Sequence, residues 1–356
     1  MIQAKLLPLI ESLGLDETGW NTLAEQSETN TVFQTHQWVS SWDKVYGRQY
    51  EQWCISVSDA TGIMGVAPLM VKRGFFGERV VMFVGEGKAD YADILSAGDK
   101  RIELEAICNV LFEARERWDV LELNNIPAES STVELMQEIV RDAGCRTLQR
   151  DLYQSPTLLI RGHEDEALGV FNKAGLRRRQ NYFQRKGRLT FKTLTGRSIL
   201  SCLDEFFDQH ISRWKGSGTP SLFLQERNRT FYRELALAMA KNGWLLMSVV
   251  ELDGRPLAMH YGFDYNGKLL WYKPSFDPAH AKHSPGLVLL RHMIGYAIDN
   301  EREELDFTIG DEPFKSRFAN HTRKTIRLQI FQDPVHFAVA WSRQKLGAVK
   351  RKLESL

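Results

Sequence analysis

The stretch Lys282-His283-Ser284-Pro285-Gly286-Leu287 decides the fold that this sequence predicts. Ser284 is placed to cap a helix, and Pro285 suits the first helical position. Gly286 has no side chain, so a ligand can come close to the backbone there. The free N–H groups of a first helical turn, together with the helix dipole, favour an anion at this point. The stretch therefore predicts a helix start that is ready to bind a phosphate group.

Strand patterns stand on both sides of this helix start. Residues 268–272 precede it, and residues 305–309 follow the apolar helical pattern that extends to Ile298. Two earlier strand patterns, 244–252 and 256–265, are separated from the next strand by the hairpin signals Asp-Gly and Asn-Gly. The second half of the chain therefore predicts an antiparallel meander that leads to the helix, followed by one more strand.

Acidic residues and a histidine in this region are candidate bases. Asp306 lies in the predicted strand 305–309, where its two neighbours point to the opposite face, so it is a candidate base or a group that orients an acceptor. The alternative is a salt bridge. Asp311 and Glu312 are more exposed candidates. His260 is a further candidate base, and a buried structural histidine is an equal alternative.

Composition excludes several classes of protein. His280 and His283 have the H-x-x-H spacing without the glutamate of a zinc protease motif, so we expect no metal. The four cysteines form no C-x-x-C pair, which argues against a zinc or thioredoxin site and favours a reduced, cytoplasmic setting. The net charge is +1, which gives no general preference for nucleic acid or membrane. The N-terminal sequence lacks the apolar core of a signal peptide, and we expect none.

One window of the second half is strongly basic. Residues 167–203 contain nine lysines and arginines and no aspartate or glutamate, and three of the arginines are consecutive, at Arg177, Arg178 and Arg179. Arginine guanidinium groups match phosphate geometry, so we expect an anion site that suits an acidic sugar, a nucleotide sugar, a lipid diphosphate, CoA or RNA. The alternative is a solvated helix face that acidic neighbours balance in space.

The first half of the chain predicts an α/β unit. Trp38 and Trp42 share a helix face and are expected in the core. Strand patterns follow, and a glycine-rich turn then leads into Asp90 and Tyr91, which either line a cleft or belong to a tight turn with solvated carboxylates. Helices at 101–117 and 131–143 alternate with strands at 119–124 and 145–152. We see no phosphate-ready helix start in this half.

An ordered set of motifs resembles the CelD/BcsL family. The set comprises Phe33-Gln34-Thr35-His36-Gln37-Trp38, Gly65-Val66-Ala67-Pro68-Leu69, Asp90-Tyr91-Ala92-Asp93, Ser155-Pro156, Arg177-Arg178-Arg179, Ser284-Pro285-Gly286, Asp306-Phe307 with Gly310, and Phe314-Lys315 with Phe318. Members of that family are GNAT-like proteins labelled as acetyltransferases of cellulose and exopolysaccharide synthesis. They are related to the Fem peptidyltransferases, which carry two GNAT-like domains in one chain. The resemblance covers roughly residues 30 to 332.

The resemblance implies roles for individual residues. It implies acetyl-CoA or another acyl-CoA as co-substrate, with no metal, bound by Ser284, Gly286, Leu287 and Tyr272. Lys315 resembles the lysine of a Lys-x-x-Phe segment at the Fem reaction centre, and a surface lysine is the alternative. With Asp306 and His260 it completes the predicted catalytic set. Arg177, Arg178, Arg179, Asp90 and Tyr91 are the predicted substrate-binding residues.

The expected fold class is α/β (α+β), with two tandem GNAT-like domains that have mixed sheets flanked by helices. We expect a helical lead-in at 1–30, a degenerate GNAT-like domain at 31–153 and a GNAT-like acyltransferase domain at 154–334. Residues 335–356 predict a basic amphipathic helix that packs on its own domain or, alternatively, contacts an anionic membrane or a membrane-bound synthase.

Three functions are compatible with these observations. The first is transfer of an acyl group from acyl-CoA to an anionic small-molecule or glycan-precursor acceptor. The second is a Fem-like transfer from aminoacyl-tRNA, which would use the basic window for RNA and weaken with salt. The third is a non-catalytic accessory protein of polysaccharide synthesis.

Overall fold

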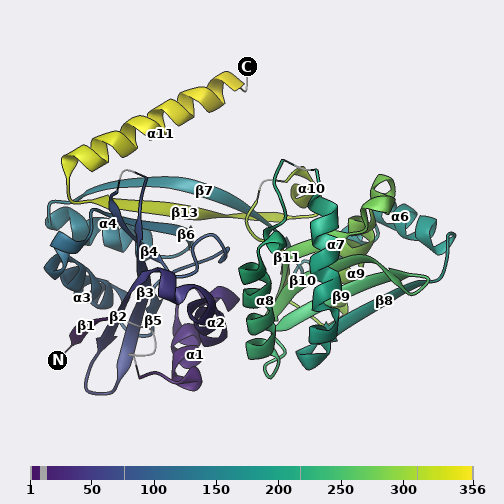
Figure 1. The fold of residues 1–356 in the computed structure, drawn as a ribbon, viewed down its shortest axis with the longest axis horizontal. Helices are drawn as coiled ribbons and strands as arrows, with labels where there is room; N and C mark the ends of the chain where they lie inside the picture. Colours follow the sequence, from purple (N-terminus) through teal and green to yellow (C-terminus); the bar gives the residue numbers. More distant parts are fainter. Residues whose placement is uncertain (1, 9–13, 76, 217, 311, 355–356) are drawn as a thin grey trace. The chain divides into compact units, whose positions relative to one another are not determined.

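The computed structural model describes residues 2–8, 14–75, 77–216, 218–310 and 312–354. These residues group into two compact units (Figure 1). Unit 1 contains residues 1–153 and 324–356, and unit 2 contains residues 154–323. The unit boundaries fall inside two long strands, β7 and β13, so each of these strands contributes residues to both units.

Unit 1 is a mixed sheet with helices packed on it. Its strands are β1 (Gln3–Leu7), β2 (Glu51–Ser58), β3 (Ile63–Arg73), β4 (Arg79–Phe83), β5 (Leu95–Ser96), β6 (Val120–Pro127), the first part of β7 (Arg146–Leu159) and most of β13 (His321–Phe331). Its α-helices are α1 (Glu17–Gln26), α2 (His36–Tyr46), α3 (Lys100–Glu113), α4 (Thr132–Asp142) and α11 (Pro334–Glu354). The strand order is β1-β2-β3-β4-β6-β13-β7, and β4 and β6 run parallel.

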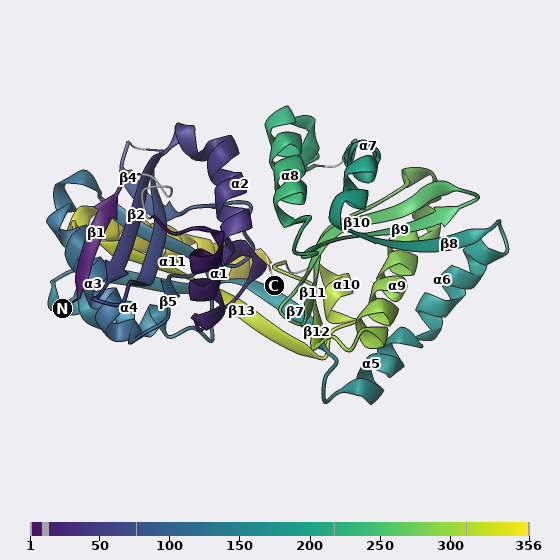
Figure 2. The same ribbon diagram turned by 90° about the horizontal axis from the view of Figure 1, so that it is seen from below.

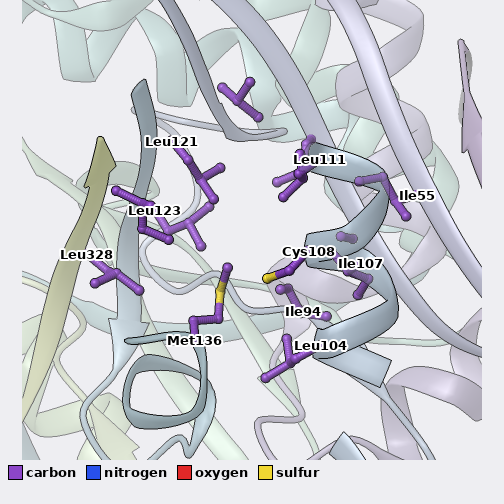
Figure 3. Packing of buried hydrophobic residues seen from close by; sticks show 14 of the residues in the cluster. Ile55, Ile94, Leu104, Ile107, Cys108, Leu111, Leu121, Leu123, Met136 and Leu328 are labelled. Carbon is purple, nitrogen blue, oxygen red and sulfur yellow. The ribbon is translucent and has the colours of Figure 1, made fainter. Parts of the chain in front are cut away.

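Helices α3 and α4 bury their apolar side chains against this sheet. Figure 3 shows Leu104, Ile107, Cys108 and Leu111 of α3 in one cluster with leucines of β6 and β13 and with Met136 of α4. The apolar positions of α3 recur at three- and four-residue intervals, so they form one stripe facing the sheet. Trp38 and Trp42 of α2 are also buried, as predicted.

A buried carboxylate fixes the chain after Tyr91 in unit 1. The Asp93 side chain accepts hydrogen bonds from Thr29 Oγ1 (2.8 Å), Ser130 Oγ (2.6 Å) and Thr132 Oγ1 (2.6 Å), and the Lys100 ammonium lies 3.4 Å away. A buried carboxylate is tolerated only when its oxygens are paired in this way. Asp93 therefore ties the loop between β4 and β5 to the segments that precede α2 and α4.

Unit 2 contains a second mixed sheet. Its strands are the end of β7, β8 (Leu189–Thr195), β9 (Leu245–Leu252), β10 (Arg255–Tyr265), β11 (Lys268–Phe276) and β12 (Glu304–Asp306). Its α-helices are α5 (Glu164–Phe171), α6 (Ala174–Gln184), α7 (Leu203–Trp214), α8 (Glu226–Met239), α9 (Pro285–Asp299) and α10 (Pro313–Ser316). The strand order is β7-β12-β11-β10-β9-β8, and β11 and β12 are the parallel pair.

Helices cover both faces of this second sheet. In Figure 2, α7 and α8 lie on one side of β9 and β10, and α5, α6 and α9 lie on the other. Leu269, Trp271, Leu305 and Phe307 pack with α9 in one core cluster. An aromatic cluster on the opposite face joins α7 and α8 to Tyr261 of β10, with Phe206 and Tyr232 in ring contact with it.

The elements differ from the sequence-based expectation at three places. Residues 3–7 form β1, which pairs with β2, where only helices were expected before residue 30. The strand expected at 305–309 ends at Asp306, because Thr308 adopts the left-handed conformation with a φ of 56°. The strand expected at 145–152 continues to Leu159. The domain boundaries stay predictions, and residues 324–334 group with unit 1 here.

The C-terminal helix forms as predicted and has one anchored aromatic side chain. Phe337 of α11 contacts Phe331 at 5.8 Å between ring centroids, and the Arg146 guanidinium lies 5.2 Å from the Phe337 ring. Val335, Trp341 and Leu346 are exposed. Among the residues that the structure describes, no helix is long and apolar enough to cross a membrane.

Replacing Asp93 by alanine removes the acceptor that three buried hydroxyl groups share. We expect the free energy of unfolding to fall by about 3–5 kcal/mol, because buried donors are left without a partner. Asp142→Ala is the matched control, since Asp142 is exposed at the end of α4, and its effect should stay within about 0.5 kcal/mol. Urea unfolding of both variants measures the difference, and equal midpoints would contradict the role given to Asp93.

Candidate functional site

The start of α9 has an unusual backbone conformation. Ser284 occupies the N-cap position with a φ of 54° and a ψ of 59°, and its side chain makes no capping hydrogen bond. Ser284 is therefore the N-cap residue, as predicted, but its side chain does not cap the helix. A capping side chain reaches the first turn from an extended backbone, and Ser284 is in the left-handed region. The Ser284 carbonyl instead accepts the Leu287 N–H at 3.0 Å, and Pro285 takes the first helical position.

The space beside Gly286 is open. A Cβ atom built on this residue would have only the edge of the Phe276 ring nearby, at 3.7 Å, which is an ordinary contact. Packing within the protein therefore does not require glycine at this position. A ligand that approaches the first turn of α9 meets backbone there rather than a side chain.

Strands β11 and β12 separate at the position where β12 ends. They pair over three residues, and the last pair is Leu270 with Asp306. The chain after Asp306 leaves β11 and stays on β7, the antiparallel partner on the other side of β12, since Phe307 N–H donates to Pro156 O and Gly310 N–H donates to Gln154 O, both at 3.0 Å. Strand β11 continues to Phe276 without this partner. The Thr308 hydroxyl donates to Trp271 O across the point of separation at 3.2 Å.

A bulge in β11 lies beside this point. Tyr261 pairs with Lys273 and Phe263 pairs with Leu270, so that Gly262 of β10 faces two residues of β11. Gly262 is required here, because a Cβ atom would collide with the His260 ring and with the carbonyl oxygen of Leu270. The bulge turns the Tyr272 N–H toward His260 Nε2, which accepts it at 3.0 Å.

His260 is placed as a buried acceptor. It is fully buried and stacks on Trp271 at 4.9 Å between ring centroids. Since Nε2 accepts a hydrogen bond, the proton of the neutral ring lies on Nδ1, which has no hydrogen-bond partner among the described residues. Burial lowers the pKa of His260 to about 3. These observations favour the structural alternative for His260, and its use as a base stays a prediction.

Asp306 and Tyr272 point to the opposite face from His260. The neighbours of Asp306 in sequence, Leu305 and Phe307, belong to the α9 core, and so does Trp271, on which His260 stacks. Tyr272 instead faces α8, with its hydroxyl 3.0 Å from the Tyr232 hydroxyl. Asp306 is buried, and its Oδ1 accepts the Thr308 N–H at 2.7 Å. The structure thus groups two predicted residues, Asp306 and Tyr272, and separates His260 from them.

Lys315 is a buried lysine at the end of this segment. Its ammonium group donates to Ile309 O at 2.8 Å and lies 2.9 Å from a Glu312 carboxylate oxygen. The alternative of an exposed surface lysine is therefore wrong, because the side chain is only 5% exposed. Gly310 has a φ of 136°, and a Cβ there would lie 2.7 Å from the Lys315 ammonium. Asp311 lies outside the described residues.

Arg213 connects the end of α7 to the same segment. Its guanidinium donates to Pro274 O of β11 and lies 4.6 Å from the Phe276 ring. Burial lowers the Arg213 pKa, and the nearby Glu312 carboxylate acts in the opposite direction. Glu312 therefore lies between two cations, Arg213 and Lys315, at the end of β11.

The three consecutive arginines separate in space. Arg179 and the predicted cofactor residue Leu287 line one pocket of about 460 Å³. Arg177 and Arg178 are exposed on α6 and do not line that pocket. Of the other cations in the basic window, Lys192 pairs with Glu251 of β9, which agrees with the alternative that acidic neighbours balance this charge in space.

Asp90 and Tyr91, two of the predicted substrate-binding residues, belong to unit 1. Both are buried, and the Tyr91 ring contacts Phe33 at 5.9 Å between centroids in an edge-on geometry. The tight turn of the alternative is present, since Gly85 and Gly87 have positive φ and the Lys88 and Ala89 N–H groups donate to Gly85 O, but the Asp90 carboxylate is buried and not solvated. The prediction that they bind substrate is untested.

Four residues at the site were not predicted from the sequence: Thr308, Arg213, Lys173 and Arg317. Gly310 signals a turn, but a threonine in the left-handed region leaves no sequence signal. Lys173 belongs to the basic window in which an anion site was expected, but it was not singled out there, and Arg317, two residues after Lys315, was given no role. Within the described residues, no group of three or more histidine, cysteine or acidic side chains is arranged to hold a metal.

The low pKa of His260 predicts an acid-sensitive fold. Between pH 6.5 and about 3 the unfolded chain binds a proton at this residue that the folded chain does not, so stability falls as pH falls through this window. One such group changes the free energy of unfolding by at most ~1.4 kcal/mol per pH unit. Urea unfolding at pH 7 and pH 4.5 should show a smaller loss in His260→Gln than in the unsubstituted protein. An equal loss in both would contradict the assignment.

Sequence comparison supports part of the predicted resemblance. Residues 172–316 match the family model described as an acetyltransferase (GNAT) domain. No curated protein has a matching sequence. The narrower resemblance to the CelD/BcsL family stays a prediction.

Solved structures share the fold over most of the chain at low sequence identity. FemX has a TM-score of 0.65 and 11% identity, covering 88% of this chain and 96% of FemX. L-PGS from Bacillus licheniformis has a TM-score of 0.54 and 15% identity over 94% of each chain. The C-terminal domain of a putative lysylphosphatidylglycerol synthetase from Agrobacterium fabrum has a TM-score of 0.54 and 13% identity, covering 86% of this chain and 95% of that domain.

At these identities the structural likeness concerns the fold alone. It confirms the predicted fold class of mixed sheets flanked by helices in a GNAT-like arrangement. The chain thus carries a match to GNAT acetyltransferase domains within unit 2, and it shares its fold with FemX.

Proposed function

We propose that this protein is an acyltransferase that moves an acyl group, most simply acetyl, from acyl-CoA to an amine or hydroxyl of a polysaccharide or cell-envelope precursor. The observation that carries the proposal is the separation of β11 and β12 after Leu270 and Asp306, since the part of β11 that then lacks this partner leads through residues 277–284 to the start of α9. An extended donor can lie along the unpaired edge of β11 while its phosphates meet the first turn of the helix.

The residues at the helix start fit a diphosphate. Gly286 leaves the backbone accessible, and its N–H lies in the first turn of α9, where the i→i−4 pattern of the helix supplies no acceptor; Pro285 has no N–H, and the Leu287 N–H donates to Ser284 O. The segment before it, Pro278–His283, holds Lys282 and two histidines, and Lys282 is exposed. Backbone donors, a helix dipole and a nearby cation are the features that anion sites of this kind share.

The transfer itself needs a nucleophile, a way to accept its proton and stabilisation of negative charge. The acceptor amine or hydroxyl attacks the thioester carbonyl carbon, a C–N or C–O bond forms, the C–S bond breaks, and the thiolate leaves and takes up a proton. Asp306 orients the acceptor or accepts its proton, because its carboxylate lies where β11 and β12 separate, on the Tyr272 face. Lys315 stabilises the negative charge that develops on the carbonyl oxygen.

Burial makes Lys315 suitable for this role. Its ammonium is held by the Ile309 carbonyl and by Glu312, so it does not reorient during the reaction. A charge fixed in a partly buried site stabilises a transition state more than a mobile, solvated one does. The third donor position on the ammonium is the one that the reacting group would use.

The acceptor class rests on the resemblance to the CelD/BcsL family and on the charge of α6. Arg177 and Arg178 are exposed on that helix and suit an anionic precursor. The same exposed cations favour a second candidate, in which the donor is an aminoacyl-tRNA and α6 contacts the RNA backbone. The two candidates share the chemistry at Lys315 and differ in the donor.

The proposal predicts that a large side chain at Gly286 prevents binding of the donor. Isothermal titration with acetyl-CoA and with CoA should give micromolar affinity for the unsubstituted protein and no measurable binding for Gly286→Trp, because the indole fills the space beside the helix start. Gly169→Trp is the matched control, since Gly169 also lies in a helix of unit 2 with open space around it, and it should bind as the unsubstituted protein does.

The two possible failures of this titration have different meanings. Loss of binding in both tryptophan variants would point to misfolding and is checked by their thermal unfolding. If the unsubstituted protein binds neither ligand, the acyl-CoA proposal is wrong. Binding of aminoacyl-tRNA that weakens steeply with salt would then favour the second candidate, and no binding of tRNA either would favour a non-catalytic accessory protein.

Lys315→Ala should lower turnover without a matching loss of donor affinity. We expect kcat to fall about 10²–10³-fold, the usual effect of removing one group that stabilises an oxyanion. Release of CoA thiol in the presence of amino-sugar and glycan acceptors measures turnover, and the titration above measures affinity. Lys241→Ala is the control for loss of a lysine charge, since Lys241 is an exposed lysine of unit 2 that follows α8 and has no role in the proposed site. Unchanged kcat in Lys315→Ala would exclude the proposed role.

A further inference from the structure

The pocket beside the start of α9 is a second feature of unit 2 with no role so far. It has a volume of about 460 Å³, which lies in the range of small-molecule sites. It is lined by Lys173, Ala174, Gly175, Leu176, Arg179, Leu287, Arg317 and Phe318. All of these residues belong to unit 2, and Leu287 connects the pocket to the first turn of α9.

The charge of the pocket is unbalanced. Three of the lining side chains are cations and none is acidic. Within the described part of the chain, none of the three has a carboxylate oxygen within 4.0 Å. Three cations that converge without a counter-ion repel one another, so an anion in the pocket would relieve that repulsion.

The cations are held in place by neutral groups. The Lys173 ammonium donates to the Arg317 carbonyl oxygen and lies 5.4 Å from the centre of the Phe318 ring. Arg179 donates to Gly175 O at 3.0 Å. These contacts orient the side chains and leave their charge intact, since a backbone carbonyl and an aromatic ring carry no formal charge.

Two helix starts face the same pocket. Lys173 is the N-cap of α6 and has no side-chain capping bond, and Ala174, Gly175 and Leu176 form the first turn of that helix. Leu287 belongs to the first turn of α9. Helix N-termini add a partial positive charge and backbone N–H donors to the three cations.

We propose that this pocket binds a phosphomonoester dianion, the ribose phosphate at the nucleotide end of the CoA donor. This inference rests on the proposed function, in which the CoA diphosphate lies at the first turn of α9. The pocket shares Leu287 with that turn, so the next phosphate along the nucleotide lies within its reach. Lys173, Arg179 and Arg317 are its ligands, and Arg177 and Arg178 are not, since they do not line the pocket.

Dephospho-CoA, which lacks only this phosphate, is the probe that tests the proposal. By isothermal titration the unsubstituted protein should bind CoA at least about 10-fold more tightly than dephospho-CoA, as expected for charge-assisted hydrogen bonds from several cations. Lys173→Ala and Arg317→Ala should each lose most of this preference and bind dephospho-CoA as the unsubstituted protein does. Lys173→Arg should keep the preference.

Arg185→Ala controls for net charge, because Arg185 is an exposed cation at the end of the same helix, outside the pocket. It should keep the full preference for CoA. Equal binding of CoA and dephospho-CoA by the unsubstituted protein would overturn the pocket proposal and leave the acyltransferase proposal standing. An equal loss of preference in Arg185→Ala would also overturn it, since the effect would then be one of overall charge.

Discussion

The separation of β11 and β12 after Leu270 and Asp306 is the constraint on which the site depends. The chain leaves β11 at this point, while Phe307 and Gly310 keep donating to β7, with which β12 already pairs. Thr308 adopts the left-handed conformation just after the end of β12, and its hydroxyl still donates to the Trp271 carbonyl. The remaining part of β11 has no β12 partner on that edge, and under the proposal it receives the donor.

Buried polar groups on the two faces of the unit 2 sheet have different roles. On the α9 face, His260 pairs with the N–H that the β11 bulge turns away from the strand ladder. On the other face, the Tyr272 hydroxyl lies 3.0 Å from that of Tyr232 in α8, and Asp306 accepts the Thr308 N–H. In the segment that follows β12, Lys315 pairs with Glu312. A misplaced bulge would move Tyr272 directly, so the structural role of His260 has consequences for the site as well as for stability.

The sequence predicted the meander, the helix after it and the charged segment around Lys315, because hairpin signals and apolar periodicity are local. It failed where the outcome depends on distant partners. Residues 305–309 look like one strand, yet β12 ends at Asp306, where Thr308 takes the left-handed conformation while the chain stays hydrogen-bonded to β7, some 150 residues earlier. Likewise, a run of three arginines carries no sign that Arg179 alone turns into a pocket with Lys173 and Arg317.

A crystal structure of the protein with CoA tests the central claim most directly. The account predicts the CoA diphosphate at the first turn of α9, at the backbone N–H of Gly286, and its thiol along β11 near the last β11–β12 pair, Leu270 and Asp306. CoA bound to unit 1, or bound to unit 2 away from the start of α9, would contradict it.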